Sequence, residues 1–378
     1  MSGRTGFREV NQVRRRVDGI GLVTGRALFT DDYNLPGMLS AKVLRSPHPH
    51  ARIVSIDPSA ARALPGVRAV LTWKDVPRVI ITEAGQGCPE PSPYDKFILD
   101  NKVRFVGDEV AVVAADTTEI AEKALGMIAV EYEQLPPIFD PRDSMKPGAP
   151  VIHDEPEWRI PIPVEMDPKK NMCGRADVTI GDMEKGFAEA DVVLEHEYEN
   201  HYAQHVANEP HTSICYLDPD NRLVVITSTQ VPFHARRIVA RALDIPVKRV
   251  RVIKPRVGGG FGSKQDIVTE PLCAALALAT GRPVRLQLTR EEVFTASRTR
   301  HHCITALKTG IRKDGTLTAI EMNVLQNAGP YGTHGLTVLT NTGSKVLPLF
   351  RCDNIRINAW SVYTNLSQGG AYRGNGGT

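Results

Sequence analysis

Short apolar runs separated by turn residues dominate the first third of the chain. Strands are expected at 39–44, 51–56, 68–72, 103–105, 109–114 and 128–132. Helical patterns lie between them at 58–64 and from Thr117 to Met127, and Pro-Gly and Pro-His pairs mark the turns. Two strand-helix-strand units of this kind predict one α/β domain of about 120 residues.

A change in composition follows this first region. Residues 137–175 are rich in proline and have little periodicity, which is typical of an ordered linker that lies across a surface. We therefore expect the domain boundary there.

The next region alternates apolar and polar positions and then carries two strand-to-helix turns. One strand, 223–228, leads through "TSTQ" into a helix from Pro232 to Leu243, and proline suits the first turn of a helix. A second strand, 249–255, leads through "VGGGFGSK" towards a helix at 270–280, and a strand at 283–288 follows. Such turns share one edge of an α/β layer, where ligands are usually held.

Composition and charge narrow the class of protein. The 378 residues include 42% hydrophobic and 24% charged residues, which indicates a soluble globular protein with more than one core. The net charge of +3 is spread along the chain, so nucleic acid is not expected as a partner. No apolar stretch approaches the roughly 20 residues that span a bilayer, and a cytoplasmic location is expected. The six cysteines form no C-x-x-C pair, so neither a disulfide framework nor a cysteine-rich metal site is indicated.

The glycine run at 257–264, "VGGGFGSK", departs from the familiar phosphate-binding motifs. A phosphate loop aligned on Lys264 would need glycine at Ser263 and serine or threonine at Gln265, and a dinucleotide fingerprint started at Gly258 would need glycine at Ser263. Taken alone, the run is either a tight strand-helix connection or a backbone-lined site for an anion or cofactor. His201 and His205 lie in a stretch expected to be strand, and no acidic or cysteine partner suggests a zinc site there.

Several ordered motifs together give a long resemblance. "TSTQ", "VGGGFGSK", "TGRPVRL", "SRTRHH" and the terminal "AYRGNGG" resemble the molybdenum-cofactor subunit of the xanthine oxidase and aldehyde oxidase family, and "NEPHT" and "VRFVGDEVAVVAADT" extend the likeness over roughly 16–376. The resemblance implies an α+β chain. Its expected parts are an extension at 1–15, an α/β hammerhead domain at 16–136, the linker at 137–175 and a first molybdopterin-binding domain at 176–378.

The resemblance also implies an enzyme with a site on the two turns. The family uses a molybdenum-carrying molybdopterin, expected here in its cytosine dinucleotide form, to insert water-derived oxygen at an activated C–H bond of an N-heterocycle, aldehyde or related small molecule. Gln230 matches the glutamine that hydrogen-bonds an oxygen ligand of molybdenum, and no direct protein ligand to the metal is expected. The cofactor would lie against the glycine run at 257–264, where glycine has no side chain to collide with it. The residues of this run that would contact the cofactor are Gly259, Gly260, Phe261 and Gly262.

Two arginines and one glycine complete the implied site. Arg373 and Gly374 match the loop that passes beside the metal. Arg300 matches an arginine that contacts substrate and stabilises negative charge in purine-oxidising members. The alternative for Arg300 is a solvated arginine in a basic patch with Arg298, His301 and His302.

The sequence departs from the family at the substrate positions. Gln265 stands where purine-oxidising relatives have a glutamate, and Asn375 stands where many relatives have an aromatic residue. A purine-type binding pose is therefore not indicated. The arginine loop contains no cysteine, which argues against the copper-containing carbon monoxide oxidisers.

The length is the largest departure, since single-chain relatives continue for several hundred residues and supply the general-base glutamate there. We expect a split gene, with a second molybdopterin subunit, a [2Fe-2S] subunit and an FAD subunit as partners. The start methionine favours this over a fragment. Two other functions stay open: a reductive relative that removes a phenolic hydroxyl from an aromatic thioester, and a non-catalytic scaffold or cofactor-insertion protein.

Overall fold

The computed structural model describes residues 9–84 and 86–377, so the first eight residues of the expected extension lie outside the described part. The helices are α1 (Gly19–Val23), α2 (Ser59–Ala63), α3 (Thr118–Leu125), α4 (Pro141–Ser144), α5 (Met183–Ala188), α6 (Pro232–Ala242), α7 (Glu270–Thr280), α8 (Arg290–Ala296) and α9 (Gly335–Val346). The first strands are β1 (Leu39–Arg45), β2 (Ala51–Asp57), β3 (Val67–Thr72), β4 (Lys102–Val103), β5 (Glu109–Ala115), β6 (Ala129–Gln134), β7 (Met172–Ile180) and β8 (Val192–Asn200). The others are β9 (Thr212–Leu217), β10 (Leu223–Thr227), β11 (Val250–Ile253), β12 (Val284–Gln287), β13 (His302–Ile311), β14 (Leu317–Gly329) and β15 (Ile355–Tyr363).

Most of the expected elements are present, and local signals explain where they begin and end. The Thr117 hydroxyl caps α3 by accepting a hydrogen bond from the N–H of Ile120. Proline occupies the first turn of α6, and Gly281 ends α7 with a φ of 63°. The sequence predicted a strand from His201 to His205. This prediction is wrong, because β8 ends at Asn200.

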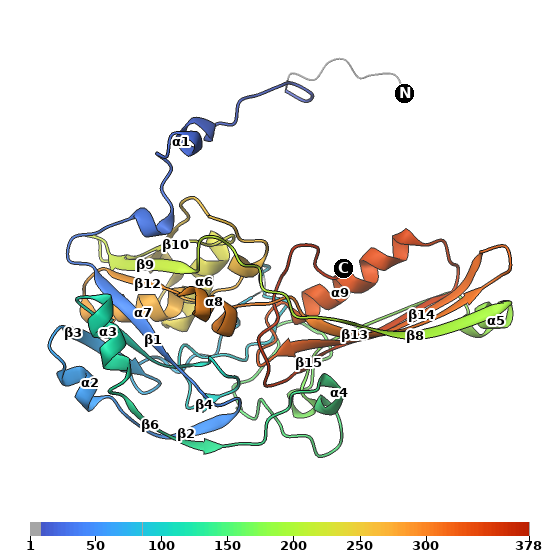
Figure 1. The fold of residues 1–378 in the computed structure, drawn as a ribbon, viewed down its shortest axis with the longest axis horizontal. Coiled ribbons are helices and arrows are strands. Elements are labelled where there is room, and N and C mark those ends of the chain that lie inside the picture. Colours follow the sequence, from blue (N-terminus) through green and yellow to red (C-terminus); the bar gives the residue numbers. More distant parts are fainter. Residues whose placement is uncertain (1–8, 85, 378) are drawn as a thin grey trace.

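Within the described residues, the strands form three sheets, which Figure 1 shows in their arrangement. A seven-stranded sheet has the order β11-β10-β9-β12-β1-β5-β3, a five-stranded sheet has the order β7-β15-β14-β13-β8, and β4-β2-β6 form a small third sheet. Strand β1 pairs in parallel with β12 and antiparallel with β5, so it joins the first 136 residues to the later strands. The two halves of the chain therefore share one sheet.

The main core lies between the seven-stranded sheet and helices α6 and α7. On the other side of this sheet, β5 packs against α3 and the three-stranded sheet. All seven residues of β5 are buried: Glu109 pairs with Lys96, and the run from Val110 to Ala115 consists of small and branched apolar residues. A separate apolar cluster lies between α9 and the five-stranded sheet.

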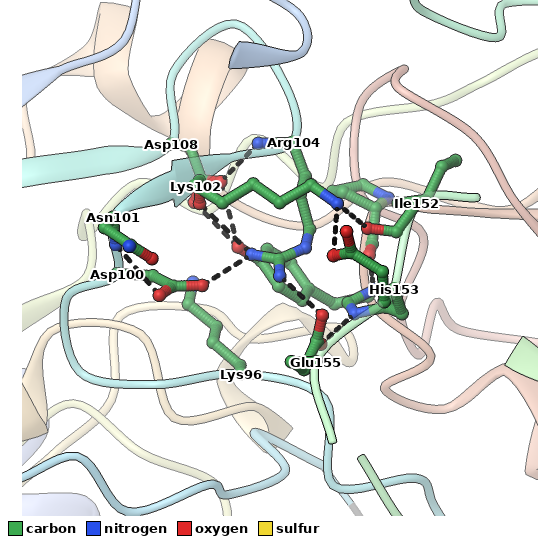
Figure 2. A network of polar contacts seen from close by, with 12 residues as sticks. Lys96, Asp100, Asn101, Lys102, Arg104, Asp108, Ile152, His153 and Glu155 are labelled. Carbon is green, nitrogen blue, oxygen red and sulfur yellow. Dashed lines mark hydrogen bonds and ion pairs between the residues drawn. The ribbon is translucent and has the colours of Figure 1, made fainter. Parts of the chain in front are cut away.

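A buried polar network fastens residues 152–155 to the first domain (Figure 2). The Arg104 guanidinium lies 2.9 Å from a carboxylate oxygen of Asp100 and 2.9 Å from one of Glu155. The Nδ1 atom of His153 also contacts Glu155, and its Nε2 atom lies 2.7 Å from the carbonyl oxygen of Pro330. Burial alone would raise the pKa of Glu155, but His153 and Arg104 hold it below its usual range. The predicted linker is thus held in the interior at residues 152–155 by buried ion pairs and hydrogen bonds.

Among the described residues, no helix is long and apolar enough to cross a membrane.

Candidate functional site

The two predicted turns follow two neighbouring parallel strands. Strands β10 and β11 pair in parallel, with Leu223 opposite Val250 and Ile226 opposite Ile253, so their C-terminal ends meet at the same sheet edge. The N–H of Gln230 donates to the carbonyl oxygen of Lys264 at 2.7 Å, which ties the first turn to the end of the glycine loop.

The side chain of Gln230 is oriented by the glycine loop. Its Oε1 atom accepts a hydrogen bond from the N–H of Gly262 at 3.0 Å. Because an N–H group requires an acceptor, this bond assigns the oxygen end of the amide to the loop. The NH₂ end is left to donate to a group in the adjoining cavity.

At three glycines of the loop, an added Cβ atom would collide with other parts of the chain itself. A Cβ atom on Gly260 would lie 2.7 Å from Cδ of Gln230, and one on Gly258 would lie 2.6 Å from Cβ of Glu209. Gly262 has a φ of 111°, and its added Cβ would meet the backbone of Ala371, 2.6 Å from the carbonyl carbon. Protein atoms thus fill the places where the sequence suggested that a cofactor would exclude side chains.

A second loop, 370–377, approaches the glycine loop. The N–H of Arg373 donates to the carbonyl oxygen of Phe261 at 2.8 Å. The Asn375 side chain turns inward, and its Oδ1 accepts from the N–H of Tyr372 at 2.8 Å. Lys345 of α9 donates to the carbonyl oxygens of Gly374, at 2.7 Å, and Asn375. The arginine loop is therefore held by the backbone of Phe261 on one side and by the side chain of Lys345 on the other.

One cavity of about 360 Å³ lies between the two loops. It is lined by Gln230, Phe261, Gly262, Gln265, Lys345, Tyr372, Arg373, Gly374 and Asn375. Most residues predicted for the site meet here, while Gly259 and Gly260 lie in the same loop without lining the cavity. Phe261 is 46% exposed and adopts a φ of 51°.

Arg300 lines a neighbouring cavity of about 640 Å³ that shares Lys345, Tyr372 and Asn375 with the first. Its guanidinium carbon lies 4.3 Å from the centroid of the Tyr372 ring, a cation–π geometry.

The solvated basic patch considered for Arg300 is not present. Arg298 is buried and pairs with Asp266 at 2.8 Å and with Glu83. His301 is also buried, which lowers its pKa to about 3. Their side chains are interior parts of the structure.

Glu209 of "NEPHT" is a supporting residue whose role the sequence reasoning did not assign. Its Oε2 atom accepts from the N–H of Gly258 at 2.7 Å and from Nζ of Lys264 at 2.8 Å. Lys264 is only 1% exposed, and burial lowers its pKa while Glu209 opposes that change. Glu209 thus holds both ends of the glycine loop, and the only signal in the sequence was the motif itself.

His205 and Gln86 also reach the site. The ring of His205 stacks on Tyr372 with centroids 4.4 Å apart, and its Nε2 lies 2.7 Å from the carbonyl oxygen of Ala371. From the first domain, Gln86 donates to Oε1 of Gln265 at 2.7 Å. Neither contact could be foreseen, because each joins residues far apart in the sequence.

The residues that line the smaller cavity suit an anionic, oxygen-rich cofactor whose metal is bound by the cofactor and not by protein side chains. Its walls offer the NH₂ group of Gln230, the guanidinium of Arg373 and the ammonium of Lys345, and none of the described residues that line it is acidic. In the described part of the chain, no cluster of three or more His, Cys, Asp or Glu residues is placed to hold a metal ion. A molybdopterin, whose metal is held by the pterin, fits these residues.

Comparison with known proteins agrees with this assignment. Residues 164–378 match the family model for the molybdopterin cofactor-binding domain, and residues 24–136 match that for the a/b hammerhead domain of aldehyde oxidase and xanthine dehydrogenase. The chain belongs to this family of molybdenum-dependent oxidoreductases. The predicted family and fold class are confirmed, while the exact domain limits at 16, 137 and 176 stay predictions.

The chain spans different shares of its individual relatives. The chain is 43% identical to the probable hypoxanthine oxidase XdhD of Escherichia coli O157:H7 over 96% of its own length but only 40% of that protein. It is 36% identical to the nicotinate dehydrogenase large molybdopterin subunit of Eubacterium barkeri, of which it spans 80%. The aldehyde oxidoreductase of Desulfovibrio gigas matches with a TM-score of 0.86 at 27% identity, over 96% of this chain and 39% of that one.

Proposed function

We propose that the chain forms the molybdopterin-binding part of a multi-subunit molybdenum hydroxylase. It would oxidise an N-heterocycle, an aldehyde or a similar activated C–H bond. The observation that carries this proposal is the convergence of Gln230, Phe261, Gly262 and Arg373 on one cavity, with the NH₂ end of Gln230 left to face it.

The cofactor would supply the redox chemistry, and the oxygen transferred to the substrate would come from water. The chain's own residues would bind and orient. The NH₂ group of Gln230 would donate to an oxygen atom at the metal centre, and Arg373 would place a fixed positive charge beside it. The loop from Gly259 to Gly262 would lie against the cofactor, and Phe261 would limit the access of water.

Substrate recognition would fall to the residues around the two cavities. Arg300 lines the larger cavity, and Asn375 lies at the wall that both cavities share. The Asn375 oxygen is engaged with Tyr372, so its NH₂ group is the part left for a substrate. Gln265 would offer an uncharged amide where a glutamate would offer a carboxylate.

The proposal includes partners and a cofactor form. A further molybdopterin-binding polypeptide, a [2Fe-2S] subunit and an FAD subunit would complete the enzyme, and the pterin would carry a cytosine dinucleotide. Two curated relatives support this arrangement because their names describe subunits: the large molybdopterin subunit of nicotinate dehydrogenase and the gamma subunit of a 6-hydroxypseudooxynicotine dehydrogenase complex. The cytoplasmic location stays a prediction.

The test is to purify the assembled enzyme through a tag on this chain and to measure bound molybdenum and turnover. We expect stoichiometric molybdenum and oxidation of a heterocycle or aldehyde with an artificial electron acceptor. Arg373→Ala should lower turnover on the order of 10²-fold, as when one preorganised contact is lost. The exposed Arg251 makes the matched control, since Arg251→Ala removes the same charge outside the cavity.

Other results would contradict the proposal. An assembly without molybdenum would indicate a scaffold, and a preparation that only removes hydroxyl groups from aromatic thioesters would indicate the reductive reaction. Equal rates for wild type and Arg373→Ala would show that the role given to Arg373 is wrong.

A further inference from the structure

The five-stranded sheet has one face that a single helix covers only in part. Adjacent strands lie about 4.8 Å apart and a helix is about 10 Å wide, so five strands offer room for about two helices. Helix α9 packs on β7, β15 and β14, at one side of this face (Figure 1). The side formed by β13 and β8 lies beyond these strands.

The register shows which side chains belong to that face. Tyr198 of β8 lies opposite Thr305 of β13, and Thr305 lies opposite Val324 of β14, whose side chain is in the apolar cluster under α9. By the alternation of side chains along a strand, Val192 and Leu194 share the face of Tyr198. These three side chains are 49%, 43% and 55% exposed. Apart from His196, which lies between Leu194 and Tyr198 on the same face, these side chains form an apolar strip that continues the core outward to the sheet edge.

The opposite face of β8 is different in character. Glu195, Glu197 and Glu199 alternate there, and they pair respectively with Lys308, Arg142 and His302. Strand β8 is therefore amphipathic: one face carries the three ion-paired glutamates together with Val193, and the other is apolar apart from His196. Exposed apolar side chains grouped in this way are common at interaction sites.

Tyr198, at one end of the strip, and α9 form walls of the 640 Å³ cavity, here called the sheet groove. Tyr198, Cys303, Thr305 and Val324 contribute from the sheet, and the groove is closed on the other side by Val338 and Thr342 of α9 and by Leu349. At one end the groove reaches Arg300, Tyr372 and Asn375, and the last two also line the smaller cavity. A segment that filled the groove would therefore end beside the proposed cofactor site.

We propose that the sheet groove binds an amphipathic helix from the molybdopterin-family polypeptide that completes the cofactor site. The inference rests on the proposed function and specifies how the partner is held. The choice of occupant follows from two observations. The groove is continuous with the proposed site, and the solved relative with a TM-score of 0.86 has polypeptide well beyond the 39% that this chain matches. A helix lying beside α9 would bury the strip from Val192 to Tyr198.

The experiment places the photoreactive residue p-benzoylphenylalanine at Tyr198 in the full, assembled enzyme, followed by irradiation and peptide mass spectrometry. Val193 is the matched control, because it lies on the same strand with 44% exposure but faces the opposite side. We expect position 198 to form an adduct with a molybdopterin-family peptide outside residues 1–378. The modified positions should be three or four residues apart, as on one face of a helix. Position 193 should give no such adduct.

An adduct with a second copy of this chain, with an iron–sulfur or flavin subunit, or with no peptide at all would overturn the proposal. Molybdenum is measured in the same preparation. If the expected adduct forms but no molybdenum is present, the proposed function is contradicted and the docking proposal stands. If molybdenum and activity are present but the adduct is missing, the docking proposal is contradicted and the proposed function stands.

A pair of charge variants gives an independent measurement. Tyr198→Asp would bury an unpaired carboxylate in the contact, so recovery of the assembled enzyme should fall by at least about tenfold. Val193→Asp should leave recovery within about twofold, since surface changes cost little. Equal recovery of the two variants would also overturn the proposal.

Discussion

The side chain of Gln230 occupies the space that a Cβ atom on Gly260 would need, with its Cδ atom 2.7 Å from that position. The same side chain accepts a hydrogen bond from the N–H of Gly262. Gly260 therefore leaves room for the amide of Gln230 beside the loop, and the N–H of Gly262 holds the amide there. The two turns form one unit before any cofactor is considered.

Gly260→Ala should destabilise the protein with or without a cofactor. The added methyl group pushes against the Gln230 side chain, and overpacking of this kind costs about 1 to 3 kcal/mol. If Gln230 is the cause, Gly260→Ala should cost much less in a Gln230→Ala background. Chemical denaturation of the four proteins in this double-mutant cycle measures the coupling. Additive effects would show that the contact does not limit residue 260.

Two substitutions of Gln230 should distinguish the role of its oxygen acceptor from the role of its NH₂ donor. Gln230→Glu keeps an oxygen acceptor for the N–H of Gly262 but loses the NH₂ donor, while Gln230→Ala loses both. We expect both variants to lower turnover on the order of 10²-fold, as when a contact to the transition state is lost. Only Gln230→Ala should lower the melting temperature. A fully active Gln230→Glu variant would refute the donor role.

Glu209→Gln should destabilise the glycine loop because it leaves the ammonium of Lys264 buried without a counter-charge. Breaking a buried ion pair in this way costs about 3 to 5 kcal/mol. The double variant Glu209→Gln/Lys264→Met removes both charges and should recover most of that loss. Urea unfolding of the two variants tests this, and a loss below about 1 kcal/mol in the single variant would contradict it.

Asp95 should make stability depend on pH. Burial raises its pKa from 3.8 to about 6, although His153 opposes the shift. The folded chain therefore binds an extra proton between about pH 4 and 6, so Asp95's contribution to the unfolding free energy falls as the pH rises through that window. Asp95→Asn keeps an oxygen acceptor for the N–H of Gly332 and the hydroxyl of Tyr363 but cannot ionise.

Relative to wild type, Asp95→Asn should gain stability above pH 6, by at most about 3 kcal/mol, and should show no gain near pH 4. Denaturant unfolding at several pH values measures the difference. A constant difference across the range would mean that Asp95 titrates normally.

The sequence by itself predicted the local elements and several of the residues that meet at the candidate site. Periodicity and turn residues predicted β10, α6, β11 and α7, because each of these depends on neighbours a few residues away. The ordered motifs also predicted that Gln230, Phe261 and Arg373 belong to one site, and the cavity joins all three.

Only the tertiary structure showed which residues that are distant in the sequence contact one another. The shared sheet through β1 and β12, the hold of Glu209 on Lys264 and the contact of Gly260 with Gln230 all join residues that are distant in sequence. Their partners could not be read from periodicity, which reports only whether a side chain is buried. It was likewise the strand register that placed Tyr198 in the sheet groove, since the direction of a side chain in a sheet depends on its pairing with other strands.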